Sequence, residues 1–365
     1  MRGRATPADR SVTADEGPRL GNGRGHEVSI ERLIIGSRGS DLALWQARHV
    51  QAMLLEHHPG IECPIEIIRT QGDAITDRPL QTIADGKGFF TKELEEALLA
   101  GRIDLAVHSL KDLPTVSPDG LQVAAIPRRE DPHDVWLGRK GPSEIESGAR
   151  VGTASLRRKA QLRAFRPDLV FEDLRGNVPT RVRKLTEGQF DAVVLARAGL
   201  FRLGLLPADA HELPFEVLLP APAQGALGIQ TRSGDSRVRR LVGVLEDPEA
   251  RLAVTSERSL LNRLEGGCLV PVGAFARLGD PDGGQRSLHL DAMVASLDGS
   301  EVLRADARAD IPGDRLADAG VDADTGTDSP RSEAAIEAAR LLGVRLAESL
   351  LARGADRILA QVPRG

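Results

Sequence analysis

Short apolar runs alternate with amphipathic helical stretches over the first two thirds of the chain. Apolar strands are predicted at residues 32–36, 63–69, 104–107, 121–126, 150–152, 169–172, 191–195 and 226–231. Helical patterns lie between them, for example at residues 41–56 and 90–100. Strands that alternate with helices are typical of a mainly parallel sheet covered by helices. The pattern restarts near residue 127, so it predicts two successive α/β lobes.

The last third of the chain follows a different pattern, in which a helix precedes three strands and a final helix. A proline-rich connector at residues 219–225 precedes the strand at 226–231, which we expect to return to the first lobe. Two lobes joined by two crossovers form a cleft between them. We therefore predict a disordered tail at 1–29, domain 1 at 30–127 and 226–243, domain 2 at 128–225, and domain 3 at 248–365 with an insertion near 313–329.

The polar segment at residues 108–114 follows one of the predicted buried strands. It places Lys111 beside Asp112, and Pro114 biases Leu113 toward extended backbone. Ligands of open α/β sheets bind at the carboxyl ends of strands, where this segment lies. We therefore predict Asp112 as a general acid or base. The alternative is a surface turn with a local ion pair, which the segment alone would favour.

Three strand-to-helix junctions place arginine at or near a predicted helix N-terminus. Ser40 is a good N-cap residue, so the first helix opens beside Arg38. The other junctions carry Arg157 with Arg158, and Arg175 with Arg181. Backbone donors and guanidinium groups together bind anions. Their repetition predicts a site for several carboxylates or for phosphate.

The composition and the residue spacing argue against several classes of binding partner. The net charge of −5 and an aromatic content of 3%, with no tyrosine, argue against a nucleic-acid-binding protein. No apolar run is long enough to span a bilayer and no signal peptide is evident, so we predict a cytoplasmic protein. No His, Cys or Asp spacing matches a metal site, and Cys63 and Cys268 suggest no disulfide framework.

Several motifs resemble those of the porphobilinogen deaminase, or hydroxymethylbilane synthase, family. They are IGSRGSDLALWQA at 35–47, GKGFFTKELE at 86–95, VHSLKDLP at 107–114, GTASLRR at 152–158, LRGNV at 174–178 and LEGGCLVPVG at 264–273. The resemblance covers the chain from about residue 30 to its end, with Ala154 standing where serine is common. It implies two periplasmic-binding-protein-like (type II) α/β domains and a smaller α+β C-terminal domain.

The resemblance also implies an activity and its site residues. A dipyrromethane cofactor would be tethered by a thioether to Cys268, and a monomeric transferase would join four porphobilinogen molecules with loss of ammonia. Water would then release linear hydroxymethylbilane for haem biosynthesis. Implied catalytic residues are Asp112 and Lys111; implied cofactor-binding residues are Lys87, Thr153, Ser155, Arg157 and Arg158; implied substrate-binding residues are Arg38, Ser40, Arg175, Arg181, Arg202 and Gln224.

A different class of protein also suits two lobes with a basic cleft, namely a bilobed carboxylate-binding protein without catalysis. Such a protein would need neither a third domain nor the cysteine that it carries. Both features therefore favour the enzyme.

Overall fold

The computed structural model describes residues 3, 31–70, 91–264, 270–279, 286–312 and 330–362. Residues 31–365 form one compact unit, whose described parts contain three β-sheets. Four features predicted above lie outside the described residues: the tail at 1–29 apart from residue 3, Lys87, Cys268 and the insertion at 313–329.

The first sheet contains five strands in the order β2-β1-β3-β10-β4. These strands are β1 (Ile35–Ser37), β2 (Ile65–Ile67), β3 (Leu105–Ser109), β4 (Leu121–Ala125) and β10 (Leu227–Arg232). β10 runs antiparallel to β3 and to β4, whereas β1 is parallel to β2 and β3. The strand predicted at 226–231 thus does join the first sheet, after the chain has built the second.

Helices α1 (Asp41–His57), α3 (Lys92–Leu99) and α7 (Ser236–Gly243) accompany this sheet. α1 begins where the sequence predicts, because the hydroxyl of Ser40 accepts a hydrogen bond from Ala43 N at 3.4 Å. Its face that carries Val50 and Leu54 is buried. Capping and amphipathic spacing therefore fix this helix beside the first strand.

The second sheet repeats this arrangement in the order β7-β6-β8-β5-β9. Its strands are β5 (Asp134–Gly138), β6 (Arg150–Gly152), β7 (Val170–Glu172), β8 (Ala192–Ala196) and β9 (His211–Leu213), and its helices are α4 (Leu156–Phe165), α5 (Val178–Thr186) and α6 (Arg197–Arg202). β5 is antiparallel to both neighbours. The sequence analysis did not predict β5 or β9: β9 is only three residues long, and β5 contains an apolar run of only three residues, at 135–137.

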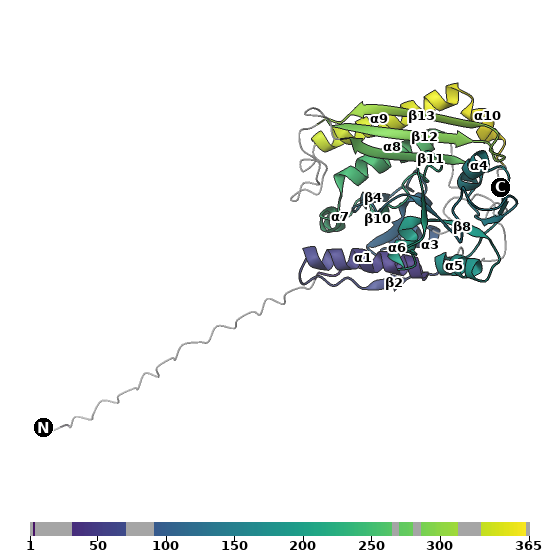
Figure 1. The fold of residues 1–365 in the computed structure, drawn as a ribbon. Coiled ribbons are helices and arrows are strands. Elements are labelled where there is room, and N and C mark those ends of the chain that lie inside the picture. Colours follow the sequence, from purple (N-terminus) through teal and green to yellow (C-terminus); the bar gives the residue numbers. More distant parts are fainter. Residues whose placement is uncertain are drawn as a thin grey trace. The chain divides into compact units, whose positions relative to one another are not determined.

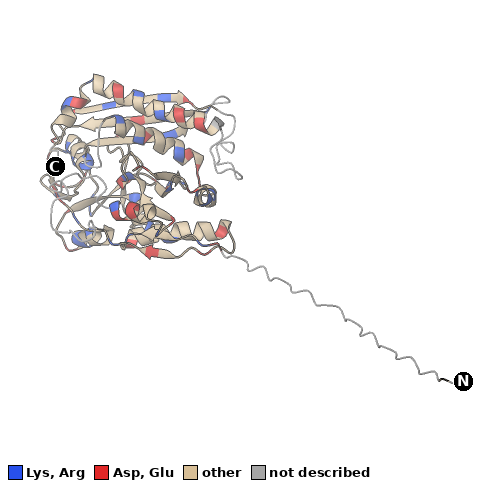
Figure 2. Cartoon of the chain, turned by 180° about the vertical axis from the view of Figure 1, so that it is seen from behind, with Lys and Arg blue, Asp and Glu red and all other residues tan. Residues whose placement is uncertain are grey.

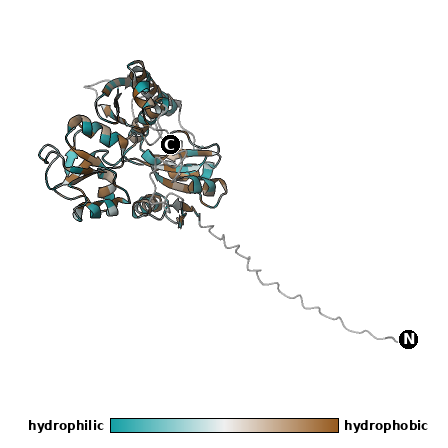
Figure 3. Ribbon diagram, turned by 90° about the vertical axis from the view of Figure 1, so that its right-hand side faces the viewer, coloured by the Kyte–Doolittle hydropathy of each residue, from teal (hydrophilic) through white to brown (hydrophobic). Residues whose placement is uncertain are grey.

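Each sheet therefore has one antiparallel strand beside a crossover, β5 after the first and β10 after the second. This symmetry confirms the expected pair of periplasmic-binding-protein-like α/β lobes. Figure 3 shows hydrophobic residues concentrated on the strands of the lobes, with many hydrophilic residues on the helices. The exact domain boundaries stay a prediction.

The third sheet is antiparallel, in the order β11-β12-β13. It consists of β11 (Val272–Gly279), β12 (Ser287–Ala295) and β13 (Val302–Asp310), and is accompanied by α8 (Pro248–Arg263), α9 (Pro330–Ala352) and α10 (Ala355–Ala360). α8 and α9 lie together against this sheet (Figure 1). Gly343 permits their close approach, since a Cβ there would lie 2.1 Å from Ser256 O.

A buried ion pair joins α8 to the segment that leads into the second lobe. The carboxylate of Glu257 is fully buried, and Arg129 Nη1 lies 2.6 Å from it. Elsewhere basic and acidic residues are interspersed over the surface elements (Figure 2). Each helix within the described ranges is too short or too polar to cross a bilayer.

Candidate active site

The predicted catalytic pair lies on the 3₁₀ turn η2 (Leu110–Asp112), immediately after β3. Leu110 and Leu113 are buried on either side of the pair, with 0% and 2% of their surface exposed. Leu110 N donates to Ala226 O at 3.0 Å, and Leu113 N donates to Leu110 O at 3.3 Å. Lys111 is half-buried and Asp112 is exposed. The buried leucines therefore anchor the turn, while its two charged side chains lie outside this apolar cluster.

Gln224, on the second crossover, connects this turn with the second lobe. Lys111 Nζ donates to Gln224 Oε1 at 3.1 Å, and Gln224 Nε2 donates to Asp134 Oδ1 at 2.9 Å. Gln224 is buried between Ala223 and Gly225, whose φ angles are 63° and 87°. The left-handed backbone at both neighbours shapes the tight turn that carries this amide.

Asp134, at the start of β5, is a functional candidate that the sequence analysis missed. Its fully buried carboxylate lies 2.7 Å from Arg157 Nη1 through Oδ2, and Oδ1 accepts from Arg158 Nη2 at 2.6 Å and Nε at 3.1 Å. Burial raises the pKa of Asp134, but the two guanidinium groups outweigh this effect and hold it well below its usual range. An aspartate that begins a strand after Pro132 carries no distinctive sequence signal.

The two arginines begin α4, as predicted, and are almost completely buried. Ser155 caps this helix by accepting from Arg158 N at 3.4 Å. Arg157 Nη1 also donates to Leu219 O at 2.6 Å, and Arg158 Nη1 donates to Val194 O at 2.9 Å. Other groups of the protein thus bind both guanidinium groups. The sequence analysis had treated these two arginines only as ligand-binding residues.

The groups around the turn have an excess of positive charge. Mutual electrostatic effects link four cations and two carboxylates, a net charge of +2: Lys111, Arg157, Arg158, Arg181, Asp112 and Asp134. Burial lowers the pKa of Lys111 to about 8 against the attraction of Asp112. Burial, with the nearby charge of Arg158, lowers the pKa of Arg181 to about 10. Such a site favours an anionic ligand, so it fits the acidic side chains of a dipyrromethane.

Several other predicted site residues have structural contacts. Thr153 Oγ1 accepts from Ser155 N at 3.3 Å, and Arg175 Nη2 lies 3.5 Å from Asp173 Oδ2. The positive charge of Arg38 helps to lower the pKa of His108, on β3, after the larger effect of burial. These residues therefore lie at the strand and helix ends where the motifs placed them.

Arg202 is more deeply buried than a solvent-facing ligand residue would be. Its Nη2 donates to Gly225 O at 2.7 Å, and its guanidinium carbon lies 5.7 Å from the centre of the Trp45 ring on α1. Burial lowers its pKa to about 10. Arg202 therefore links the second crossover to both lobes.

Of the two cysteines, Cys63 lies within the described residues. Cys63 is a free thiol in the core with 5% of its surface exposed, and burial raises the pKa of this thiol. A buried, protonated thiol is a poor nucleophile. Cys268, the predicted attachment residue, lies outside the described residues.

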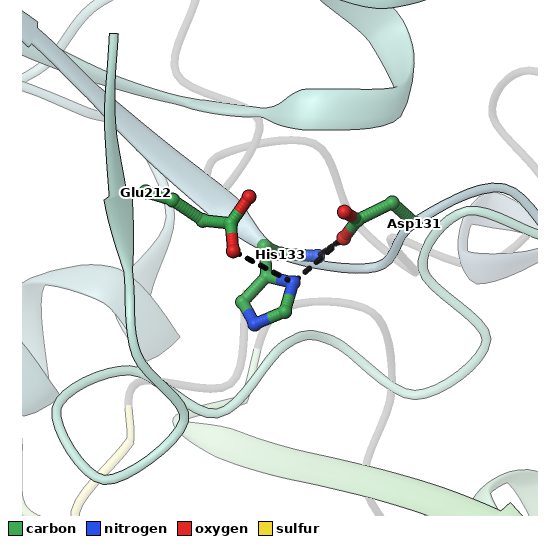
Figure 4. A group of neighbouring side chains, drawn as sticks. All are labelled: Asp131, His133 and Glu212. Atoms are coloured by element: carbon green, nitrogen blue, oxygen red, sulfur yellow. Dashed lines mark hydrogen bonds and ion pairs between the residues drawn. The ribbon is translucent and has the colours of Figure 1, made fainter.

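A second group of ionisable side chains lies near the first crossover, at Asp131, His133 and Glu212 (Figure 4). His133 Nδ1 lies 2.7 Å from Asp131 Oδ1 and 3.6 Å from Glu212 Oε1. Arg197 Nε lies 3.3 Å from Asp131 and 3.4 Å from Glu212. The guanidinium group pairs with both carboxylates, so we interpret the group as an ion-pair network.

Comparisons with known proteins agree with this arrangement. Residues 33–240 match the family model described as "Porphobilinogen deaminase, dipyromethane cofactor binding domain", and residues 251–352 match "Porphobilinogen deaminase, C-terminal domain". A porphobilinogen deaminase of Syntrophobacter fumaroxidans is 46% identical over 332 residues, covering 90% of this chain and 97% of the relative. One of Roseiflexus sp. is 53% identical over 275 residues, covering 74% and 88%.

Similarity to solved structures of other proteins is remote. The methionine binding protein MetQ aligns with a TM-score of 0.37 at 14% identity, over 57% of this chain and 87% of MetQ. Family assignment rests instead on the two family models and the full-length relatives. On these grounds the chain belongs to the porphobilinogen deaminase family.

Proposed function

We propose that this chain joins four porphobilinogen molecules head to tail with loss of ammonia, and then releases linear hydroxymethylbilane by hydrolysis. It would thus act as a hydroxymethylbilane synthase of the tetrapyrrole pathway. The observation that carries the proposal is the contact series Lys111–Gln224–Asp134, which connects the turn bearing Asp112 with two buried arginines. The deaminase names of the relatives favour catalysis over carboxylate binding alone.

Substrate binding would use the excess positive charge. Each pyrrole of the substrate carries an acetate and a propionate, so the growing chain adds carboxylates at every step. A ligand carboxylate beside Lys111 or Arg181 would offset the burial that lowers their pKa values. Each charge-assisted hydrogen bond contributes about 1.5–3 kcal/mol. Arg38, Ser40, Arg175 and Arg202 are the further substrate-binding candidates.

Asp112 would act on the charge that develops in the substrate. When the C–N bond within the protonated aminomethyl group breaks, its electron pair leaves with ammonia, and the methylene-bearing pyrrole becomes cationic. A carboxylate close to the pyrrole N–H stabilises that cation. The terminal pyrrole carbon of the growing chain then forms the new C–C bond and loses its proton. The pyrroles are therefore neutral again at the end of each cycle.

The cofactor site would combine the start of α4 with the third domain. When bound, the dipyrromethane supplies the terminal pyrrole carbon to which the first substrate is joined. Thr153, Ser155, Arg157, Arg158 and Lys87 are the residues that we propose to hold its carboxylates. Cys268 is proposed as its thioether anchor. The basic, buried end of α4 supports this assignment.

Mass spectrometry of the intact purified protein tests the anchor directly. We expect added covalent mass that maps to Cys268, and its absence in Cys268→Ala. Cys63→Ala is the matched control, because that thiol is buried in the first lobe and should leave the added mass unchanged. Added mass on Cys268→Ala would refute the attachment.

Turnover of porphobilinogen tests the role of Asp112. We expect Asp112→Asn to fold, to retain the cofactor mass and to lose at least about a hundredfold in kcat, within the usual range of general acid–base effects. Wild-type rates in that variant would exclude the role. The monomeric state and the cytoplasmic location stay predictions.

A further inference from the structure

One guanidinium group contacts the catalytic turn on both sides of Lys111 and Asp112. Arg258, on α8, donates through Nη1 to Leu110 O at 3.1 Å and to Leu113 O at 2.9 Å. Its Nη2 donates to Pro114 O at 2.6 Å. Three carbonyl groups that surround the catalytic pair in sequence thus converge on a single side chain from another part of the fold.

The turn needs such a partner because it is short. A 3₁₀ turn of three residues has poor internal hydrogen-bond geometry, and Leu113 N to Leu110 O is long at 3.3 Å. The planar guanidinium fork has donors in fixed directions, whereas an ammonium group is a compact point charge on a flexible stem. Arginine is therefore suited to fixing several carbonyl directions at once.

The same helix leads toward the proposed cofactor anchor. α8 ends at Arg263, five residues before Cys268 in the sequence. Glu257, the neighbour of Arg258, accepts hydrogen bonds from Ala223 N at 2.6 Å and Ala276 N at 2.8 Å. α8 is thus fixed to the second crossover and to the third sheet at the turn of helix that reaches the catalytic loop.

We propose that Arg258 is a positioning residue for the reaction, which holds the Lys111–Asp112 turn at a fixed place relative to the helix that carries the cofactor segment. This inference rests on the proposed role of Asp112 and adds a residue that does not touch substrate. Displacement of a catalytic group by about 1 Å can cost about a hundredfold in rate. Loss of the three hydrogen bonds should therefore lower kcat.

A cavity beside Arg258 makes a chemical rescue experiment possible. Its volume is about 310 Å³, and Leu110, Val254, Arg258 and Asn262 are among the residues that line it. Arg258 is only half-buried. Truncation at this position would enlarge an existing space, into which a free guanidinium ion could enter and reach the same carbonyl groups.

The test compares Arg258→Ala with Arg251→Ala in the cofactor-bearing enzyme. Arg251 is the matched control, because it lies on the same helix and lines the same cavity but binds Glu246 at 2.6 and 2.9 Å. We expect Arg258→Ala to retain cofactor mass and to lose about 10- to 100-fold in kcat, with KM changed less than about threefold. Arg251→Ala should lose thermal stability without a matching loss in kcat.

Guanidinium chloride at low, non-denaturing concentration should restore part of the activity of Arg258→Ala. It should not restore Arg251→Ala or Asp112→Asn, and sodium chloride at the same concentration should have no such effect. Arg258→Lys should recover part of the rate, and it keeps the test available if the alanine variant does not fold. Rescue by either route supports the positioning role.

Three results would overturn the inference. The first is an unchanged kcat in Arg258→Ala or, if that variant does not fold, in Arg258→Lys. The second is an equal loss of kcat in the Arg251 and Arg258 variants that follows their loss of stability. The third is no recovery by either guanidinium or lysine. Inactive wild-type enzyme, or a fully active Asp112→Asn variant, would instead refute the proposed function itself.

Discussion

Replacing Asp134 with asparagine should strongly destabilise the second lobe. Asp134 is fully buried and lies within 2.7 Å of both Arg157 and Arg158. Asparagine keeps the shape of the side chain and one oxygen acceptor but removes the negative charge. The substitution would leave two buried guanidinium groups without their carboxylate, while their contacts to backbone carbonyls remain.

The magnitude follows from the cost of breaking a buried ion pair. Removal of one partner costs about 3–5 kcal/mol, because the remaining charge is left uncompensated in a low-dielectric interior. The individual charge-assisted contacts, at about 1.5–3 kcal/mol each, would sum to more, but contacts within one network are not additive. We therefore expect the free energy of unfolding to fall by about 3–5 kcal/mol.

Urea unfolding at pH 7 and pH 5 measures this loss, with Asp173→Asn as the control. Asp173 also forms an ion pair, with the ammonium group of Lys159 at 2.6 Å, but 48% of the Asp173 side chain is exposed. Its substitution should change the free energy of unfolding by about 0–1 kcal/mol. Equal effects of the two substitutions would refute the importance that we assign to burial.

The pH dependence gives a second check. The pKa of Asp134 lies well below its usual range in the folded protein, so its stabilising effect is complete above the unfolded value of about 3.9. It is lost only as the pH falls below that value toward the folded pKa. The difference between wild type and Asp134→Asn should thus be the same at pH 7 and pH 5. A difference that shrinks between these two values would contradict the depressed pKa.

Three further predictions concern the site and its support. The pKa of Lys111 is about 8, so its ammonium charge is present below that pH and lost above it. The pH profile of kcat/KM should fall above pH 8 in the wild type, and this inflection should disappear in Lys111→Arg, which stays charged. Glu257→Gln should lower the free energy of unfolding by about 3–5 kcal/mol in urea titrations, because the largely buried guanidinium group of Arg129 loses its carboxylate; a loss below about 1 kcal/mol would be inconsistent with this. Gly225→Ala should lower the melting temperature more than Gly188→Ala: both have positive φ, but only at Gly225 would a Cβ lie 2.2 Å from Glu130 O. Equal losses in melting temperature at the two glycines would show that the backbone moves to relieve the contact with Glu130 O.

The sequence by itself determined the elements whose signals are local. Ser40 and the apolar spacing after it placed the start of α1 correctly, and the pattern of the last third predicted the helix that precedes the three strands, which is α8. Capping and helical periodicity depend on residues within a few positions of one another. The family motifs were likewise visible as contiguous segments, including the Lys111–Asp112 turn.

Only the tertiary structure decided which partners these residues have. Asp134 meets Arg158 across 24 positions and Gln224 across 90, and Arg258 meets Leu110 across 148. Such pairs form because the chain returns through two crossovers and because α8 packs against the lobes. No local sequence pattern reports these long-range arrangements. The physical reason is that ion pairs and carbonyl contacts depend on distance in space and on burial, whereas the sequence patterns report only which face of an element is apolar.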